Sequence, residues 1–258
     1  MEKLPISVII ITLNEADRIT AAIRSVIDWV DEVVLIDSGS QDNTVELASE
    51  LGARVMYNAW PGYGQQKRFA EEQAHNDWLL NLDADERVTE SLRSEIAKHF
   101  EQPQKLADGY QIAIHDIIYP TEELNPNTPY KPVRLYRKSK GRYSDSPVHD
   151  RVIMQPDSQV EKLHGKIAHA SIRSFAHRVE KMNAYSDAQV QDMVDKGRKP
   201  SVARILLEFW LSFIKRYFFK GYWRKGLIGY IYAINYAYSR FLRQIKLYEY
   251  YKNNQKNK

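Results

Sequence analysis

The sequence of 258 residues contains no cysteine, which excludes disulfide bonds, thiolate metal ligands and a cysteine nucleophile. It also lacks any uninterrupted run of about 18 apolar residues, so we expect no membrane-spanning helix. The N-terminus enters a strand-like segment directly, without the charged and then apolar layout of a signal peptide. These absences are compatible with a cytoplasmic protein in a reducing compartment.

The net charge of +4 conceals two regions of opposite character. Residues 198–258 hold 14 Lys or Arg and 2 Asp or Glu, together with 16 of the 30 aromatic residues. Residues 1–197 hold 23 Lys or Arg and 31 Asp or Glu. We therefore predict two domains, 1–197 and 198–258. The second would be drawn to an anionic surface, either lipid or nucleic acid.

Apolar, β-branched runs alternate with helical patterns over the first hundred residues. Residues 6–12 and 32–37 are typical of strands that are buried on both faces of a parallel sheet. Strands are also expected at 53–57 and 78–82, and helices at 16–26, 44–51, 65–74, 89–99 and 174–196. This alternation predicts an α/β fold with a doubly wound, mostly parallel sheet flanked by helices.

Three polar clusters come directly after three of the predicted strands. They are Thr12-Leu13-Asn14-Glu15, Asp37-Ser38-Gly39-Ser40 and Asp83-Ala84-Asp85. Because the carboxyl ends of parallel strands meet at one edge of the sheet, we expect the clusters to converge on one crevice. Asn14 and Ser40 are also good helix caps, which is the alternative for each cluster taken alone. Paired carboxylates suit a hard dication that holds a diphosphate.

Taken together, these segments resemble the family 2 glycosyltransferases. Later segments are similar to a narrower branch, the bacterial lipopolysaccharide core-biosynthesis β-glucosyltransferases, which glucosylate an inner-core heptose. The resemblance implies a GT-A-type fold, with nucleotide-sugar binding in 1–100 and the acceptor side in 101–197. The stretches that carry the family resemblance are 8–15, 33–44 and 82–86, and those that carry the branch are 133–137, 148–151 and 181–186.

The resemblance also implies roles for individual residues near the donor. Asp83 would approach the ribose or the diphosphate, and Asp85 would bind Mg²⁺ or Mn²⁺. A late histidine, His169, is a second candidate for the metal. The nucleotide-sugar pocket would include Thr12, Asn14, Glu15, Gly39 and Lys67, with Asp37 facing the uracil ring. Lys67 as a solvated helix residue is the open alternative.

Inverting transfer also needs a base that takes the proton from the acceptor hydroxyl. In the narrower branch a His-acid pair stands where this sequence has His149-Asp150, which makes Asp150 the candidate base. His149 would orient it, bind the metal or act as a rival base, and a surface turn is the alternative to all three. The Glu-Asp and Gln-x-x-Arg-Trp patterns of processive family members are missing, which argues against a polymer synthase.

Arg134 and Arg137 alternate along a predicted strand, and we expect both to face one side and meet an acceptor phosphate; an exposed strand face is the alternative. In the tail, Leu206, Phe209, Trp210, Phe213 and Tyr217 form one face of a predicted helix, and residues 227–241 repeat the pattern. Core packing is one interpretation. The flanking lysines and arginines favour another, a basic amphipathic helical appendage that lies in a membrane interface.

The sequence therefore predicts a metal-dependent inverting transferase that moves a sugar from a UDP-sugar donor, UDP-glucose in the first instance, to a lipopolysaccharide core heptose. It would be attached peripherally to the cytoplasmic face of the inner membrane. A polyprenyl-phosphate or another glycan is the alternative acceptor. A nucleic-acid- or lipid-binding module is the alternative class, but no RNA-recognition signature is present and no nucleic-acid partner is expected.

Overall fold

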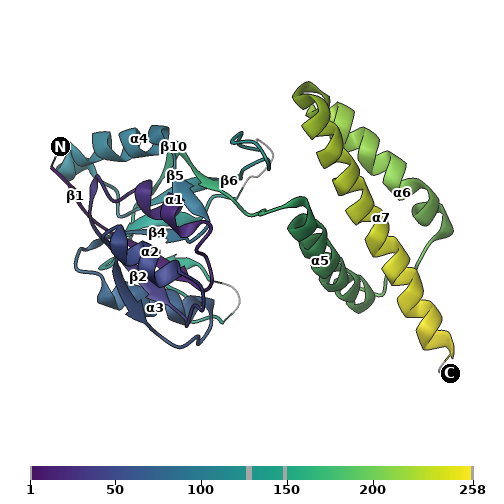
Figure 1. Ribbon diagram of the computed structural model, residues 1–258, viewed down its shortest axis with the longest axis horizontal. Coiled ribbons are helices and arrows are strands. Elements are labelled where there is room, and N and C mark those ends of the chain that lie inside the picture. Colours follow the sequence, from purple (N-terminus) through teal and green to yellow (C-terminus); the bar gives the residue numbers. More distant parts are fainter. Residues whose placement is uncertain (1, 126–129, 148–149, 257–258) are drawn as a thin grey trace. The chain divides into compact units, whose positions relative to one another are not determined.

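The computed structural model describes residues 2–125, 130–147 and 150–256, and the chain divides into two compact units (Figure 1). The first unit comprises Met1–Ser171 and the second Ile172–Lys258. The boundary predicted at 197/198 is therefore displaced. The reason is helix α5 (Phe175–Asp195), whose Val190 and Met193 share a small core with Leu247 of α7 (Gly226–Lys256). The change in charge comes only after this helix, so composition misplaced the boundary.

An eight-stranded sheet forms the centre of the first unit. Its order is β3 (Arg54–Tyr57), β2 (Val30–Asp37), β1 (Leu4–Thr12), β4 (Trp78–Asp83), β7 (Val133–Arg137), β6 (Gly109–Asp116), β10 (Val160–His169) and β5 (Glu86–Val88). Strands β3, β2, β1 and β4 are parallel neighbours, as are β6 and β10, whereas β7 and β5 run antiparallel. The predicted mostly parallel α/β sheet is confirmed, while β5 and β10 were not predicted.

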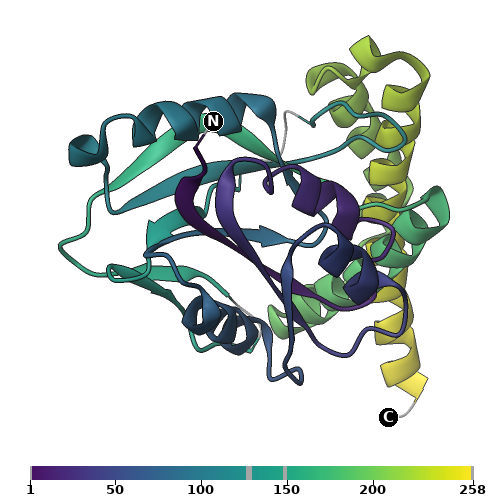
Figure 2. The ribbon, with the colours of Figure 1, turned by 60° about the vertical axis from the view of Figure 1, so that its left-hand side comes forward.

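Both faces of this sheet are covered, as Figure 2 shows. Alternate residues of β1 enter two separate cores, with Val8 and Ile10 on one side and Ile9 and Ile11 on the other. The first core takes in α1 (Ile19–Arg24), α2 (Thr44–Glu50) and α4 (Glu90–Phe100); the second takes in α3 (Tyr63–Gln73) and the two-stranded ribbon β8 (Gly141–Tyr143) and β9 (Val152–Met154). A ligand must therefore bind at an edge of the sheet.

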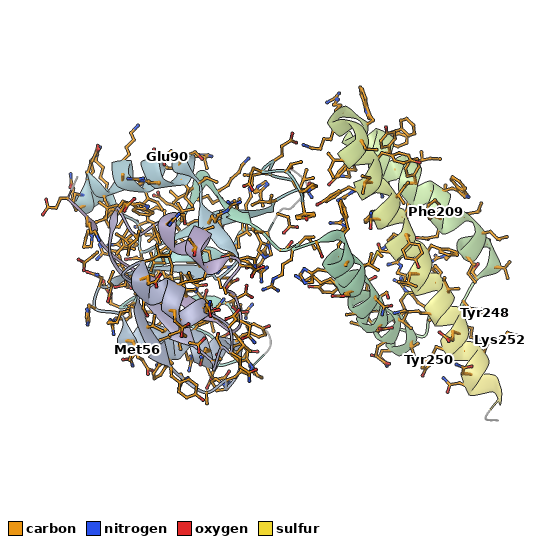
Figure 3. All side chains as sticks on the ribbon, in the orientation of Figure 1. Met56, Glu90, Phe209, Tyr248, Tyr250 and Lys252 are labelled. Carbon is orange, nitrogen blue, oxygen red and sulfur yellow. The ribbon has the colours of Figure 1, made fainter. Side chains whose placement is uncertain are left out.

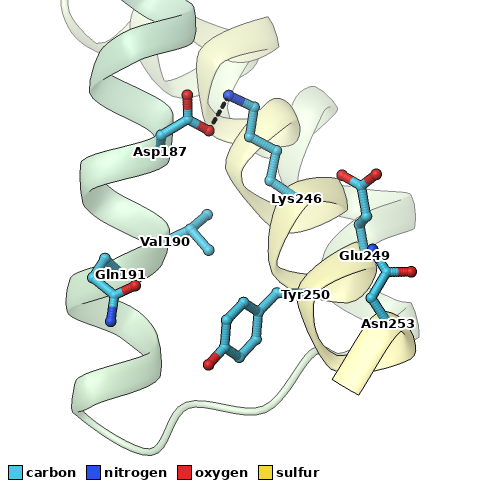
Figure 4. Close-up of a pocket in the computed structure, with 7 residues that line it drawn as sticks. All are labelled: Asp187, Val190, Gln191, Lys246, Glu249, Tyr250 and Asn253. Carbon is cyan, nitrogen blue, oxygen red and sulfur yellow. Dashed lines mark hydrogen bonds and ion pairs between the residues drawn. The ribbon is translucent and has the colours of Figure 1, made fainter. Parts of the chain in front are cut away.

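The second unit is helical. It consists of α5, α6 (Val202–Ile214), a π-helical turn (Lys215–Phe219), a 3-10 turn (Tyr222–Lys225) and α7, with α5 and α6 both in contact with α7. Figure 3 shows its side chains, among them Phe209 on α6 and Tyr248 on α7. Lys246 on α7 forms an ion pair with Asp187 on α5, 2.5 Å apart, beside an open hollow between the two helices (Figure 4). None of the described helices combines the length and the apolar character that a membrane span requires.

Candidate active site

The ends of β1, β2 and β4 bring the three predicted polar clusters together. Thr12 is paired with Asp37 across β1 and β2, and Ile11 is paired with Asp83 across β1 and β4. The hydroxyl oxygen of Thr12 is buried at this edge and has no hydrogen-bond partner among the described residues. Because buried polar atoms normally have a partner, this hydroxyl suits a ligand that binds at the strand ends.

Asn14 and Ser40 join two loops and do not cap helices. Asn14 has a φ of 56°, its backbone N–H donates to the Ser40 hydroxyl at 2.8 Å, and its side-chain oxygen accepts from the Gln41 N–H at 2.8 Å. The residues at the cap positions of α1 and α2 are Arg18 and Asn43 instead. The capping alternative for Asn14 and Ser40 is therefore wrong.

Asp37 organises the second of these loops. Its carboxylate accepts hydrogen bonds from the backbone N–H groups of Gly39, at 2.8 Å, and Ser40, at 2.9 Å. Gly39 has a φ of 105°, a backbone conformation that is strained for residues with a side chain. The glycine therefore permits the tight turn in this loop. Glu15, in the first loop, donates its N–H to the Thr44 hydroxyl at 2.8 Å. Hydrogen bonds thus link Asn14, Asp37, Gly39 and Ser40 at this edge of the sheet.

Lys67 lies at the centre of the site with only 2% of its surface exposed, so the alternative of a solvated helix residue is wrong. Its ammonium group donates to Asp83 at 2.8 Å and to Asp150 at 2.6 Å. Burial lowers the pKa of Lys67, but the charges of Asp83 and Asp150 outweigh it and raise that pKa above its ordinary value. A permanent positive charge therefore joins the acidic end of β4 to the candidate base.

Arg134 lies beneath Asp83 and not on an exposed strand face. Its guanidinium donates to Asp83 at 3.2 Å and to the buried Glu86 at 2.9 Å. Burial opposes ionisation of Asp83, but Lys67 and Arg134 hold its pKa well below the usual range. Burial also raises the pKa of Glu86 to about 7, against the opposing effect of Arg134. This network of buried charges fixes the position of the Asp83 carboxylate.

The expectation that Arg134 and Arg137 share a face is wrong. A spacing of three residues puts them on opposite faces of a strand. Arg137 pairs with Trp78, at the far end of β4, and its guanidinium lies over the Trp78 ring and 3.5 Å from Asp77. The suggested joint contact with an acceptor phosphate therefore loses its structural basis.

Asp85 and His169 form a second close pair, just beyond the end of β4 and at the end of β10. The Asp85 Oδ2 atom is 3.3 Å from Nε2 of His169, and Nδ1 of His169 is 2.8 Å from Asp116. Burial lowers the pKa of His169, but hydrogen bonds with Asp116 and Asp85 raise it to about 10. Arg18 also binds the Asp85 carboxylate, at 3.0 Å, and the carbonyl of Ala170, at 3.1 Å.

This pair fits the chemistry of a divalent cation. One carboxylate oxygen and one imidazole nitrogen converge, and the second imidazole nitrogen is held by a carboxylate, as is usual for a metal-binding histidine. In the part of the chain that the structure describes, no group of three or more His, Asp or Glu residues could hold a metal by itself. A cation here would therefore complete its coordination with ligand oxygens or water.

A glycine-containing loop positions the segment that leads to Asp150. The N–H of Tyr63 donates to the Pro147 carbonyl at 3.1 Å, and the N–H of Gly64 donates to the Ser146 carbonyl at 3.0 Å. A Cβ atom on Gly64 would lie 2.1 Å from the carbonyl oxygen of Ser144, so only glycine fits. This contact brings Asp150 within reach of Lys67. His149, the predicted companion of Asp150, lies outside the described residues.

Three further residues of the site were not predicted: Arg18, Glu86 and Asp116. Asp116 ends β6, an apolar strand, so the signal that identified Asp37 and Asp83 was also present for Asp116. Arg18 follows Glu15 by three residues and forms an ion pair with it, which sequence spacing alone does not distinguish from a surface pair. Glu86 stands next to the Asp-x-Asp motif, but its burial depends on Arg134, which is distant in the sequence.

The family model described as Glycosyl transferase family 2 matches residues 7–154, more than half of the chain. The chain belongs to this family. The matched residues contain every strand end described above except that of β10, together with Lys67 and Asp150.

Relatives extend the similarity over almost the whole chain. An uncharacterized glycosyltransferase of Rickettsia bellii is 39% identical over 255 residues, with 95% of this chain and 86% of the relative covered. The lipopolysaccharide core biosynthesis glycosyltransferase LpsC of Rhizobium meliloti is 33% identical over 258 residues, with 96% of this chain and 93% of the relative covered. Among solved structures, S. aureus TarS is 15% identical, with 97% of this chain and 92% of that chain covered and a TM-score of 0.47.

Membership of the family makes the chain a glycosyltransferase and displaces the alternative of a binding module without transfer activity. The first unit of this family 2 glycosyltransferase combines polar loops at the ends of β1 and β2 with two acidic sites near the end of β4. One of these contains Asp83, Lys67 and Asp150, and the other contains Asp85 and His169.

Proposed function

We propose that this enzyme transfers glucose from UDP-glucose to a heptose of the lipopolysaccharide inner core, with inversion at the anomeric carbon and with a bound Mg²⁺ or Mn²⁺. The observation that carries the mechanism is the double ion pair of Lys67, which joins Asp83 to Asp150. The similarity to a lipopolysaccharide core biosynthesis glycosyltransferase along nearly the full length supports the acceptor class.

The donor would bind along the strand ends. The buried Thr12 hydroxyl would meet the nucleoside, and the Asp37 loop and the Asn14-Glu15 loop would enclose it. Lys67 presents its ammonium group beside Asp83, where it would contact the diphosphate or the transferred sugar. A positive charge that is already held in place stabilises a leaving diphosphate without reorganisation during the reaction.

The residues that would hold the cation are Asp85 and His169. When bound there, the cation would supply Lewis-acid stabilisation of the departing diphosphate. Arg18 holds Asp85 from one side and Asp116 holds His169 from the other, so both candidate ligands are oriented before any cation arrives. This division of roles leaves Asp150 to act on the acceptor side.

Asp150 would serve as the base. Its Oδ2 atom is bound to Lys67 at 2.6 Å, and its second oxygen would accept the proton of the acceptor hydroxyl. As that hydroxyl oxygen bonds to the anomeric carbon, the bond from this carbon to the diphosphate oxygen breaks. The products are the glycosylated acceptor, UDP and a protonated Asp150. Attack from the side opposite the diphosphate gives inversion.

The test is UDP release from a panel of UDP-, GDP- and ADP-sugars, with Mg²⁺, Mn²⁺ or EDTA, with and without truncated lipopolysaccharide. We expect release from UDP-glucose only when both a dication and the lipopolysaccharide are present. A polyprenyl-phosphate or another glycan in place of lipopolysaccharide tests the alternative acceptors. Absence of UDP binding in all conditions would overturn the proposed donor class.

Asp150→Asn tests the base. The substitution keeps the size of the side chain and should preserve UDP binding, while transfer falls by roughly a hundredfold or more. Asp145→Asn is the matched control, because Asp145 is exposed in the same segment. Unchanged transfer by Asp150→Asn would remove Asp150 from this role.

We place this reaction at the cytoplasmic face of the inner membrane. A lipid-linked core acceptor is held in a membrane, and the basic region 198–258 is suited to an anionic surface. Attachment there would raise the rate at which enzyme and acceptor meet.

A further inference from the structure

Helix α6 is apolar around most of its circumference, although only one side of it is covered. A helix of this composition normally lies in a protein core or in lipid. One side of α6 faces α7: the Phe213 ring lies 5.7 Å from the Tyr230 ring, and Glu208 forms an ion pair with Arg240 at 3.1 Å. The predicted stripe of Leu206, Phe209, Trp210, Phe213 and Tyr217 is thereby divided, because Leu206 and Trp210 remain exposed while the other three are partly buried.

The uncovered side forms a continuous apolar surface. Its exposure is large for side chains of this kind: 67% for Leu206, 63% for Trp210 and 82% for Phe219. We define the outer face as Leu206, Trp210, Leu211, Ile214, Phe218 and Phe219, all of which are exposed. These positions follow one arc of α6 and continue into the π-helical turn. Soluble proteins rarely expose a patch of this extent unless it binds something.

Positive charges border the outer face. Lys215, Lys220 and Arg224 are exposed at the tip where α6 ends, and the Arg224 guanidinium lies 5.3 Å from the exposed Trp223 ring. Glu208 is the only acidic residue between residues 198 and 227, and it points toward Arg240 and Arg243 of α7. The outer face therefore has apolar and cationic groups but no carboxylate of its own.

This charge distribution favours an anionic lipid surface over a second copy of the chain. A two-fold contact between two outer faces would bring identical cations together without any carboxylate between them. Anionic headgroups are complementary to the lysines and arginines, while aromatic and aliphatic side chains enter the boundary between headgroups and acyl chains.

We infer that the outer face of α6 and the turn that follows it insert into the surface of an anionic bilayer, to a depth of about 5 to 10 Å. The inference deepens the membrane attachment included in the proposed function by assigning it to particular residues. It depends on the second unit alone, so its test needs no catalytic turnover.

The experiment is co-sedimentation of the full chain with phosphatidylcholine vesicles that contain either no anionic lipid or about 30% phosphatidylglycerol. We expect strong binding to the anionic vesicles only. The double variant Leu211→Glu/Phe219→Glu should bind at least tenfold more weakly. The variant Lys215→Ala/Lys220→Ala should bind anionic vesicles more weakly, by roughly fivefold for each lysine removed. In 0.5 M salt the difference in binding between this variant and the unaltered chain should become smaller.

Val179→Glu is the matched control, since Val179 is an exposed apolar residue on α5 outside the outer face. It should bind anionic vesicles as the unaltered chain does, and circular dichroism should show equal helix content in all variants. Equal vesicle binding by Leu211→Glu/Phe219→Glu would overturn the inference. So would a wild-type chain that ignores both vesicles, or one that is a dimer in solution and becomes monomeric in this variant. Transfer to a water-soluble acceptor should be unchanged, which separates this result from failure of the proposed reaction.

Discussion

The two units of the chain depart from the ordinary distribution of residues in opposite directions. In the first, Lys67, Arg134 and Glu86 are buried in contact with the partly exposed Asp83, whereas charged residues are normally exposed. In the second, large apolar residues such as Phe219 are exposed. The charges of the first unit pair with one another at an edge of the sheet, whereas the exposed apolar side chains of the second are left to water. The first arrangement suits a charged ligand and the second an apolar surface.

The means by which each unit keeps its structure also differ. The buried charges of the first unit satisfy one another, so each of them depends on its partners. Ion pairs in the second unit, such as Lys196 with Asp192 at 2.6 Å, are exposed to water and contribute little. Substitutions that remove one of these interacting side chains from either unit therefore test the comparison.

The largest expected effect is on catalysis, from Asp85→Ala. Loss of a ligand for the dication would remove several kcal/mol of transition-state stabilisation, which corresponds to about a thousandfold decrease in transfer. The measurement is UDP release in the presence of Mn²⁺ and acceptor. Because Asp85 is held by side chains at the rim and not in the core, circular dichroism should show an intact fold.

Asp157→Ala provides the control for Asp85→Ala. Asp157 is an exposed carboxylate of the same unit, paired with Lys140 at 3.4 Å, and its removal should leave transfer within twofold of the original rate. An active Asp85→Ala enzyme that still needs a dication would exclude Asp85 as the ligand.

The next effect is on stability and compares two lysines directly. Lys67→Met leaves Asp83 and Asp150 without their shared partner, and we expect it to lower the free energy of unfolding by about 2 to 3 kcal/mol. Lys196→Met in the second unit should cost about 0.5 kcal/mol or less. Urea unfolding of each variant, followed by tryptophan fluorescence and circular dichroism, gives both values. Equal losses would show that the Lys67 pairs are no more than surface interactions.

Much of the first unit could be predicted because its signals are local. The β-branched runs at 6–12 and 32–37 identify strands, and a polar cluster directly after a strand identifies the binding edge. Strand β10 was missed because its first residues are exposed and charged, so no apolar run identifies it. The boundary between the units was misplaced because helix α5 resembles the first unit in charge. Its apolar side chains, however, pack against α7 in the second unit.

The arrangement of the site depends on contacts that sequence spacing does not specify. Lys67 and Asp150 are 83 residues apart, and their ion pair requires the close contact of Gly64 with the Ser144–Ser146 backbone. Arg134 reaches Asp83 and Glu86 only because β7 lies antiparallel beside β4. The residue types could be selected from the sequence, whereas the pairs among them could not.

The smallest expected effect is that of pH on the affinity for Mn²⁺ and on stability, and it should differ between the two units. With a pKa of about 10 in the folded chain, His169 is protonated at pH 7 to 9, so a cation must displace its proton. Affinity for Mn²⁺ should therefore rise up to tenfold per pH unit toward pH 10. In the absence of metal, the stability that protonated His169 contributes is fully present below pH 6.5 and is lost as the pH rises through about 10.

Calorimetric titration of Mn²⁺ at pH 8 in Tris and in HEPES should reveal about one proton released per cation, and none for His169→Gln. Vesicle binding by the second unit should stay constant from pH 7 to 9, because residues 198–258 contain no histidine, the side chain that ordinarily changes charge near neutral pH. If metal affinity were also constant, His169 would not be a ligand, and Asp85 would bind the cation without it. A pH-dependent first unit beside a pH-independent second unit would instead assign the proton-linked step to the catalytic unit and the attachment to the basic region.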